Sequence, residues 1–180
     1  MPHALATLVG IDVAKATLDL ACQEAADKYR TRSKLPNAPA GFAQLLTWLT
    51  THARPDAWVV MEATNVYHEA AATFLHEHGY RVCVANPKQV AAYAKSELSR
   101  TKTDTTDAKL IVRFGLSHEP RLRAWQPPTS AERTLIALTR RLDDLKSLRQ
   151  MERNRLDTAD PAVHGALQAV LTMLDEQIQA

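Results

Sequence analysis

The sequence predicts an α/β fold, a mixed sheet flanked by helices, followed by an α-helical coiled-coil arm. Short apolar runs rich in β-branched residues, which are typical of buried strands, recur over the first 85 residues. Segments with helical spacing of apolar residues separate the later runs. A proline-containing stretch, residues 119–128, then leads into a long segment with leucines in a heptad pattern.

Five strands are expected, over residues 5–13, 17–22, 28–33, 58–61 and 81–85. The first three are joined by short links, so we expect an antiparallel meander. The last two are separated from it and from each other by helical segments. The sheet should therefore be mixed.

Four helices are expected in the same part of the chain, over residues 40–52, 66–78, 88–98 and 104–116. Thr64 and Asn65 are expected to cap the second, and Arg54-Pro55-Asp56 to end the first. The order of elements is then β-β-β-α-β-α-β-α-α. Residues 99–103 lack an apolar anchor and are expected to form a mobile loop.

The arm should begin with a long helix from Thr129 or Ser130 to about Asp157. Its leucines step by three and four residues, and a second amphipathic helix starts at Asp160-Pro161. A long helix cannot bury such a seam alone, so we expect both a helical hairpin and pairing with another subunit. The expected domains are residues 1–118, the linker 119–128 and the arm 129–180.

Composition excludes several classes of protein. Hydrophobic residues make up 46% and charged residues 23% of the chain, and no apolar run is long enough to cross a membrane. The first residues lack the pattern of a signal peptide. Cys22 and Cys83 lie in strand-like runs without metal-ligand spacing, which indicates buried free thiols and a cytoplasmic protein.

Charge is unevenly distributed although the net charge is only +2. Residues 81–113 and 121–155 carry an excess of Lys and Arg, whereas residues 1–80 and the last 25 are acidic. A basic middle beside a carboxylate cluster suits a polyanion held against a metal site. A solvated helix face explains the charge alone equally well.

Four acids stand at positions that topology could bring together: Asp12, Glu62, Asp104 and Asp107. Asp12 points away from the face that Val9 and Ile11 share, and Glu62 follows a buried strand at its carboxyl edge, where sites gather in α/β sheets. For Asp104 and Asp107 alone, helix capping is the commoner explanation. In this element order, the four describe a ribonuclease-H-like site for two divalent cations.

Four motifs then resemble one family: Val9-Gly-Ile-Asp12-Val-Ala-Lys15, Met61-Glu62-Ala-Thr64-Asn-Val-Tyr67, Ala85-Asn-Pro87 and Arg100-Thr-Lys-Thr-Asp104-Thr-Thr-Asp107-Ala108. They are similar to the RuvC-like DEDD domain of the insertion-sequence-110 transposases, which include a pilin-gene-inverting recombinase. The resemblance covers residues 5–118. It implies that the four acids are catalytic and bind Mg²⁺, for which Mn²⁺ can substitute.

The same resemblance implies a DNA transposase or site-specific recombinase that acts as an oligomer. In members of this family a bridge RNA guides the choice of DNA, so DNA and a guide RNA are the expected partners, with no membrane. A C-terminal domain with a serine nucleophile has no counterpart here, so we expect an N-terminal half that lacks full recombination activity. The basic residues expected to contact phosphates are Lys88, Lys95, Arg100, Lys102, Lys109 and Arg113.

Three alternatives stay open. The chain could be a stand-alone RuvC-like nuclease for branched DNA, or a non-catalytic module for nucleic-acid binding and dimerisation. An actin-like ATPase is more distant, because the second phosphate loop is missing. Tyr67, Tyr93 and Trp125 could stack on bases, although core packing is the more common role for such residues.

Overall fold

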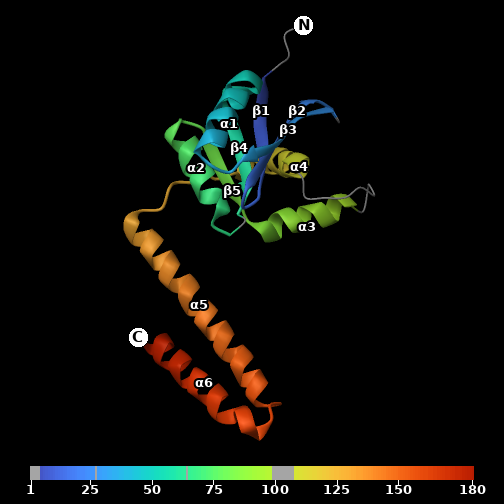
Figure 1. Cartoon of the computed structure of the whole chain (residues 1–180). Helices are drawn as coiled ribbons and strands as arrows, with labels where there is room; N and C mark the ends of the chain where they lie inside the picture. The colour runs from blue at the N-terminus through green and yellow to red at the C-terminus, as the bar shows by residue number, and fades with distance from the viewer. Residues whose placement is uncertain (1–4, 27, 64, 99–107) are drawn as a thin grey trace. The chain divides into compact units, whose positions relative to one another are not determined.

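The computed structural model describes residues 5–26, 28–63, 65–98 and 108–180 (Figure 1). The chain divides into two compact units, Met1–Pro127 and Pro128–Ala180. The first holds the sheet and the second holds the arm.

A 5-stranded sheet with the order β3-β2-β1-β4-β5 forms the first unit. Its strands are β1 (Ala6–Val13), β2 (Thr17–Ala25), β3 (Lys28–Pro36), β4 (Ala53–Glu62) and β5 (Arg81–Ala85). The first three pair antiparallel, and β1, β4 and β5 run parallel. The predicted mixed sheet with an antiparallel meander is confirmed.

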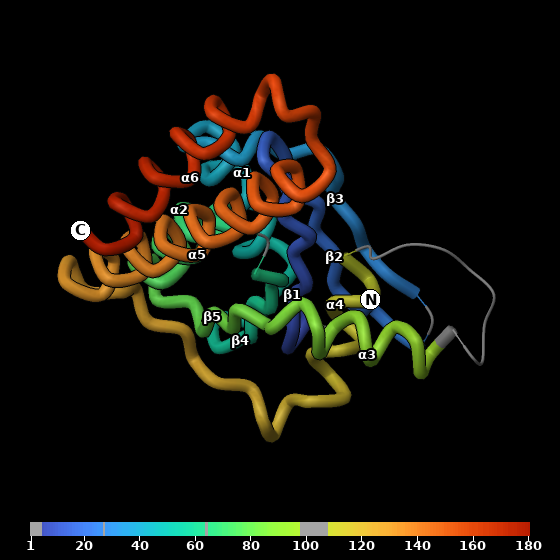
Figure 2. The backbone as a smooth tube through the Cα atoms, turned by 90° about the horizontal axis from the view of Figure 1, so that it is seen from below, coloured from blue at the N-terminus to red at the C-terminus, as the bar shows by residue number. Residues whose placement is uncertain are grey.

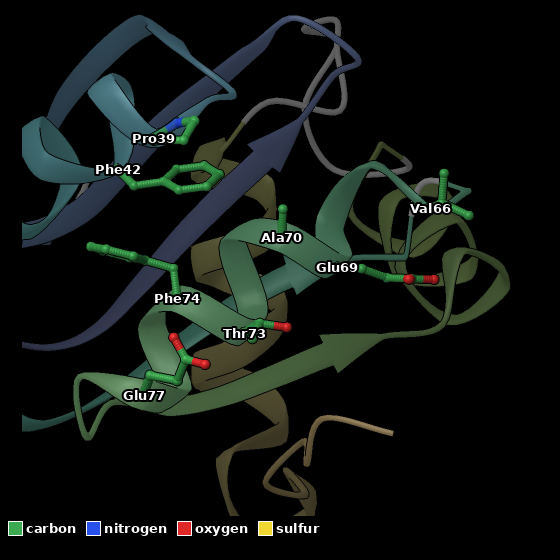
Figure 3. A pocket seen from close by; sticks show the side chains of 8 residues that line it. All are labelled: Pro39, Phe42, Val66, Glu69, Ala70, Thr73, Phe74 and Glu77. Carbon is green, nitrogen blue, oxygen red and sulfur yellow. The ribbon is translucent and has the colours of Figure 1, made fainter. Parts of the chain in front are cut away.

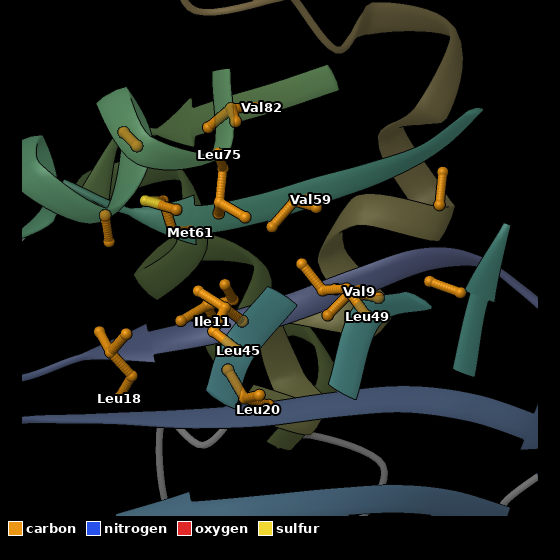
Figure 4. Close-up of a cluster of buried hydrophobic side chains, with 14 of the residues drawn as sticks. Val9, Ile11, Leu18, Leu20, Leu45, Leu49, Val59, Met61, Leu75 and Val82 are labelled. Carbon is orange, nitrogen blue, oxygen red and sulfur yellow. The ribbon is translucent and has the colours of Figure 1, made fainter. Parts of the chain in front are cut away.

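Helices cover both faces of this sheet. On one face, α1 (Pro39–His52) and α2 (Tyr67–Glu77) pack on a fully buried cluster in which Val9, Ile11 and Met61 contact helix residues such as Leu45 and Leu75 (Figure 4). On the other face, α3 (Pro87–Leu98) and α4 (Ala108–His118) pack on a second cluster. That cluster contains Leu8, Val60, Cys83, Val90, Leu110, Ile111 and Phe114.

Two local predictions are wrong. β4 begins at Ala53, directly after α1, because Arg54-Pro55-Asp56 continues in the strand and Ala53 pairs with Ala6 of β1. Asn65 does not cap α2, because its φ of 49° places it in the left-handed region, and Val66 is the N-cap residue with no side-chain cap hydrogen bond. The predicted loop 99–103, Thr64 and the predicted start of α4 lie outside the described residues.

The second unit is a helical hairpin. It consists of α5 (Ser130–Leu156), a 3-10 turn (Pro161–Val163) and α6 (His164–Gln179). A capping box starts α5, since the Glu132 N–H donates to Thr129 Oγ1 (3.2 Å) and the Thr129 N–H donates to Glu132 Oε2 (2.7 Å). Leu145, Leu171 and Leu174 are buried between the helices, and Arg149 pairs with Asp175 at 2.9 Å.

The predicted hairpin is confirmed, while the coiled coil stays a prediction. None of the helices in the described parts of the chain is long and apolar enough to cross a membrane.

Candidate functional site

Asp12 and Glu62 lie side by side on the face of the sheet that α4 covers. β1 and β4 are parallel neighbours with Ile11 opposite Met61, so Asp12 and Glu62 are next to each other across the strand pair. Neighbouring strands are about 4.8 Å apart. Both side chains point to the same side as Leu8 and Val60, because successive residues of a strand alternate between faces.

Burial and the neighbouring carboxylate both act on Glu62. The pKa of Glu62 is raised above its ordinary value, first by burial and then by the negative charge of Asp12. The two carboxylates are therefore close enough to repel each other. A pair of partly buried oxygen donors of this kind suits a hard divalent cation, which would relieve that repulsion.

The amino end of α4 packs against β1 close to Asp12. A Cβ atom on Gly10 would lie 2.4 Å from the Ala108 carbonyl oxygen and 2.8 Å from the Val112 nitrogen. Glycine is therefore required at position 10, since only its lack of a side chain permits this contact. Ala108, the first residue of α4, is buried at 4% exposure. The helix is thus anchored over the strand that carries Asp12.

The other acids predicted for the site, Asp104 and Asp107, lie outside the described residues, as do Arg100 and Lys102. Within the described ranges, no group of three or more His, Cys, Asp or Glu residues lies close enough together to hold a metal ion. The pair of Asp12 and Glu62 is the part of the predicted site that the structure places.

Asn37 ties together the two segments that follow these acids. Its Nδ2 group donates to the carbonyl oxygens of Ala14, at the end of β1, and of Tyr67, at the start of α2, both at 3.0 Å. Its own N–H donates to the Ala16 carbonyl (2.9 Å). Because Nδ2 faces two carbonyls, the amide orientation is determined by this contact.

Sequence reasoning treated the segment around Asn37 as a break and missed this role. A signal was present in Gly41, where a Cβ atom would lie 1.8 Å from the Pro36 carbonyl oxygen. Glycine at position 41 therefore leaves room for the Pro36 carbonyl in the turn before α1, next to Asn37.

Asp19 is a second residue that sequence reasoning missed. It pairs with Asp12 across β1 and β2, so it lies on the same face of the sheet. Its Oδ1 accepts a hydrogen bond from the Lys34 N–H at 2.6 Å, where β3 has a residue with φ of 58°. The Asp19 carboxylate therefore stabilises the irregular stretch of pairing between β2 and β3. Alternation within the second strand could have indicated its face.

The described basic residues of the predicted interface lie in the α3 and α4 layer. Lys88 and Lys95 are exposed on α3, and Lys109 and Arg113 are exposed one helical turn apart on α4. The aromatic residues behave as predicted for core packing. Tyr67 and Trp125 pack against the α1–α2 cluster, and Tyr93 packs against the other.

Both cysteines are buried and free, as predicted. Burial raises the pKa of the Cys22 thiol to about 11, and it also raises the pKa of Cys83. A thiol with a raised pKa is a poor nucleophile at neutral pH. These thiols therefore belong to the core.

A groove on the opposite helical layer has a different character. It lies between α1 and α2, has a volume of about 570 Å³, and includes Phe42 and Phe74, whose ring centroids are 5.4 Å apart (Figure 3). Glu69 and Glu77 line it, with no Lys or Arg among the described lining residues. An acidic groove is unsuited to a polyanion.

The first unit is thus an α/β domain whose mixed sheet carries a carboxylate pair at the carboxyl ends of β1 and β4. A family model described as "Transposase", for the DEDD transposases of the IS110 type, matches residues 9–159. The chain belongs to this family.

Two curated relatives are similar to this chain, the pilin gene-inverting proteins of Moraxella bovis and Moraxella lacunata. Each is 36% identical over 151 residues, which cover 83% of this chain and 46% of the relative. The chain thus spans about half the length of the curated relatives it matches.

Two solved structures resemble part of this chain more distantly. The Thermus thermophilus RuvC complex with a Holliday junction matches at 18% identity and a TM-score of 0.45, covering 66% of this chain and 98% of that one. The Fowlpox virus resolvase complex with Holliday junction DNA matches at 12% identity and a TM-score of 0.37, covering 62% and 97%.

Proposed function

We propose that this chain is the metal-binding and nucleic-acid-binding part of a DNA transposase or recombinase. The observation that carries the proposal is the juxtaposition of Asp12 and Glu62 on one sheet face, with the amino end of α4 anchored on Gly10 beside them. Asp107 directly precedes α4, so a short length of chain joins the third and fourth acids to this point. Family membership supports the same assignment.

Asp12 and Glu62, together with Asp104 and Asp107, would hold Mg²⁺ or Mn²⁺ through carboxylate oxygens. Bound at this edge, such cations would activate the attacking oxygen and stabilise the leaving oxygen of a phosphodiester. The protein's own contribution is to hold Asp12 and Glu62 next to each other, where a bound cation would offset their mutual repulsion. Asn37 supports this by holding the segments that follow Asp12 and Glu62 at a constant separation.

The partners we propose are DNA and a guide RNA. Support for nucleic acid comes from the exposed basic residues on α3 and α4, which lie on the same side of the sheet as the acids. Support for a guide RNA comes from the family resemblance. Phosphate contacts of this kind set affinity and salt dependence, which leaves sequence choice to base pairing.

Calorimetric titration with Mn²⁺ tests the metal site directly. Asp12→Asn, Glu62→Gln and Asp104→Ala should each weaken binding by at least tenfold, both with and without a short RNA duplex. Asp56→Asn is the matched control, because Asp56 lies on the same strand as Glu62 but is exposed and paired with Arg54. Unchanged binding in the three variants would leave a non-catalytic module, and DNA cleavage by this chain alone would favour a nuclease.

A dimer or higher oligomer through the arm is the second part of the proposal. Leu135 and Leu138 are 64% and 63% exposed on the half of α5 that precedes the buried Leu145. Exposed leucines at heptad spacing are typical of a helix that pairs with another chain. Light scattering should therefore report a monomer for Leu135→Ser/Leu138→Ser and an oligomer for the unaltered chain. A monomer in both cases would contradict this part.

A further inference from the structure

A cavity at the outer edge of β5 is lined by residues that belong to no site predicted from the sequence. Its volume is about 450 Å³, and it lies between β5, the start of α3, the end of α4 and the segment that follows α4. We refer to it as the β5-edge cavity. It is lined by Cys83, Val84, Ala85, Asn86, Gln89, Phe114, His118, Arg121, Leu122 and Arg123.

The charge of this cavity is positive. Arg121 and Arg123 line it, and the described lining residues include no Asp or Glu. Neither arginine forms an ion pair with a carboxylate in the part of the chain that the structure describes. Two guanidinium groups without a carboxylate partner, at the mouth of one hollow, are suited to an anion with several oxygen acceptors.

The polar lining adds hydrogen-bonding groups. The side chain of Gln89 is exposed beside the cavity, whereas Asn86 is already engaged, since its Oδ1 accepts from the Lys88 N–H at 2.9 Å. His118 stacks on Phe114 with ring centroids 4.5 Å apart. Its Nδ1 donates to the Phe114 carbonyl at 2.9 Å, because that carbonyl can only accept. The imidazole is thus held as one wall.

The segment that carries the arginines is held against the sheet. The Trp125 N–H donates to the Val82 carbonyl at 2.7 Å. Leu122 packs on the cluster beneath α3 and α4. Figure 2 shows this segment, in yellow, running past β5. Anchored on both sides, the arginines keep their positions at the cavity.

The cavity lies in line with the acids. Glu62 pairs with Ala85 across β4 and β5, and Ala85 lines the cavity. Asp12, Glu62 and Ala85 therefore occupy three neighbouring strands at the same edge and on the same face, about 4.8 Å apart from strand to strand. A phosphate at the cavity would be within a few nucleotides of a phosphate at the acids.

We propose that the β5-edge cavity binds a phosphodiester group of a nucleic-acid strand whose continuation passes the carboxylates. Arg121 and Arg123 make the charged contacts, and the cavity is large enough for the attached sugar. The proposal rests on the proposed function for the identity of the strand. It adds a phosphate subsite on residues to which the sequence assigned no role.

Fluorescence anisotropy with a labelled single-stranded DNA oligonucleotide, measured over a range of salt concentrations, tests the subsite. Arg121→Gln/Arg123→Gln should weaken binding at least tenfold at low salt and reduce the log–log salt slope by about 0.7, because the two arginines share one phosphate and each phosphate neutralised on a single strand contributes about that much. The matched control is Arg54→Gln/Arg81→Gln. Both of its arginines are exposed, at the amino-terminal ends of β4 and β5. It should leave the slope unchanged.

The outcomes separate this inference from the proposed function. An equal slope change in both double variants would overturn the subsite, because the effect would then be one of net charge. A mononucleotide that binds as tightly as the oligonucleotide would overturn the assignment to a strand. Loss of Mn²⁺ binding in Glu62→Gln with an unchanged salt slope in Arg121→Gln/Arg123→Gln would reject the subsite alone. No oligonucleotide binding by the unaltered chain would reject both its nucleic-acid role and the subsite.

Discussion

The two faces of the sheet begin alike and end differently. On the face covered by α1 and α2, β1 presents Val9, Ile11 and Val13, all nearly inaccessible to solvent. On the face covered by α3 and α4, the same strand presents Leu8, Gly10 and then Asp12. β4 repeats the pattern, with Val59 and Met61 on the first face and Val60 and Glu62 on the second.

The two faces of the sheet therefore have different roles. The first is apolar to its end and its surface groove is acidic, so its contribution is stability. The second changes from apolar to acidic at the carboxyl edge, with basic residues around it. Substitutions on the two faces should therefore separate folding stability from binding.

The largest effect on stability is expected on the first face. Leu49 of α1 is fully buried, and Leu49→Ala should cost about 2–5 kcal/mol of unfolding free energy because it leaves a cavity. Urea denaturation measures the loss, and Leu5→Ala, at an exposed position, is the control. Mn²⁺ affinity of the folded variant should stay unchanged. If Mn²⁺ affinity fell together with stability, the two faces would not have separate roles.

Gly10→Ala should affect both properties, because it acts where core and site meet. The added Cβ would meet backbone atoms of Ala108 and Val112, so α4 must shift away from β1. Overpacking of this kind costs about 1–3 kcal/mol. Thermal unfolding and Mn²⁺ titration should both respond.

Gly165→Ala is the control for that substitution. An added Cβ would meet no atom within 4 Å outside the backbone of its own helix, so a gain of up to about 1 kcal/mol is expected. If Gly10→Ala kept normal Mn²⁺ binding, α4 would not be the element that completes the site.

Asn37→Ala should cost about 1–2 kcal/mol, since it removes two hydrogen bonds to backbone carbonyls. It should also weaken Mn²⁺ binding, because the segments after Asp12 and Glu62 are no longer tied together. Calorimetry compares it with Leu49→Ala, which is more destabilising but lies elsewhere. Equal Mn²⁺ affinity in the two variants would reduce Asn37 to a purely structural residue.

Glu62→Gln should show a small effect whose sign depends on pH. The folded-state pKa of Glu62 is raised, so ionisation opposes folding at neutral pH, and the folded state binds the proton more tightly than the unfolded state. The variant should therefore be more stable than the unaltered protein at neutral pH without metal. The difference should vanish below about pH 4, where the carboxyl is protonated in both states.

With Mn²⁺ added, the unaltered protein should become the more stable of the two, because the Glu62 carboxylate binds the cation and the amide that replaces it does not. Thermal melts at several pH values, with and without Mn²⁺, measure both effects. If the difference in melting temperature between the variant and the unaltered protein did not change with pH, the pKa of Glu62 would not be raised by burial and by Asp12.

The sequence by itself determined the order of elements, the mixed sheet, the face of Asp12 and the place of Glu62 at the carboxyl end of its strand. The physical reason is that strand alternation and helical periodicity are local, so each can be read within a few residues. The same locality explains the capping box of Thr129 and Glu132. It also explains why Arg54-Pro55-Asp56 was expected only to end the first helix and the strand was expected to start at Trp58, since pairing of Ala53 with β1 overrides the local preference there.

Only the tertiary structure decided which distant residues meet. Asn37 reaches Ala14 and Tyr67, Gly10 receives Ala108, and the segment after α4 brings Arg121 and Arg123 to the edge of β5. Each contact depends on strand register and on how a helix packs, which are properties of the assembled core. Hydrogen bonds and charges across such distances in sequence carry no periodic signal, so they become visible only when the chain is folded.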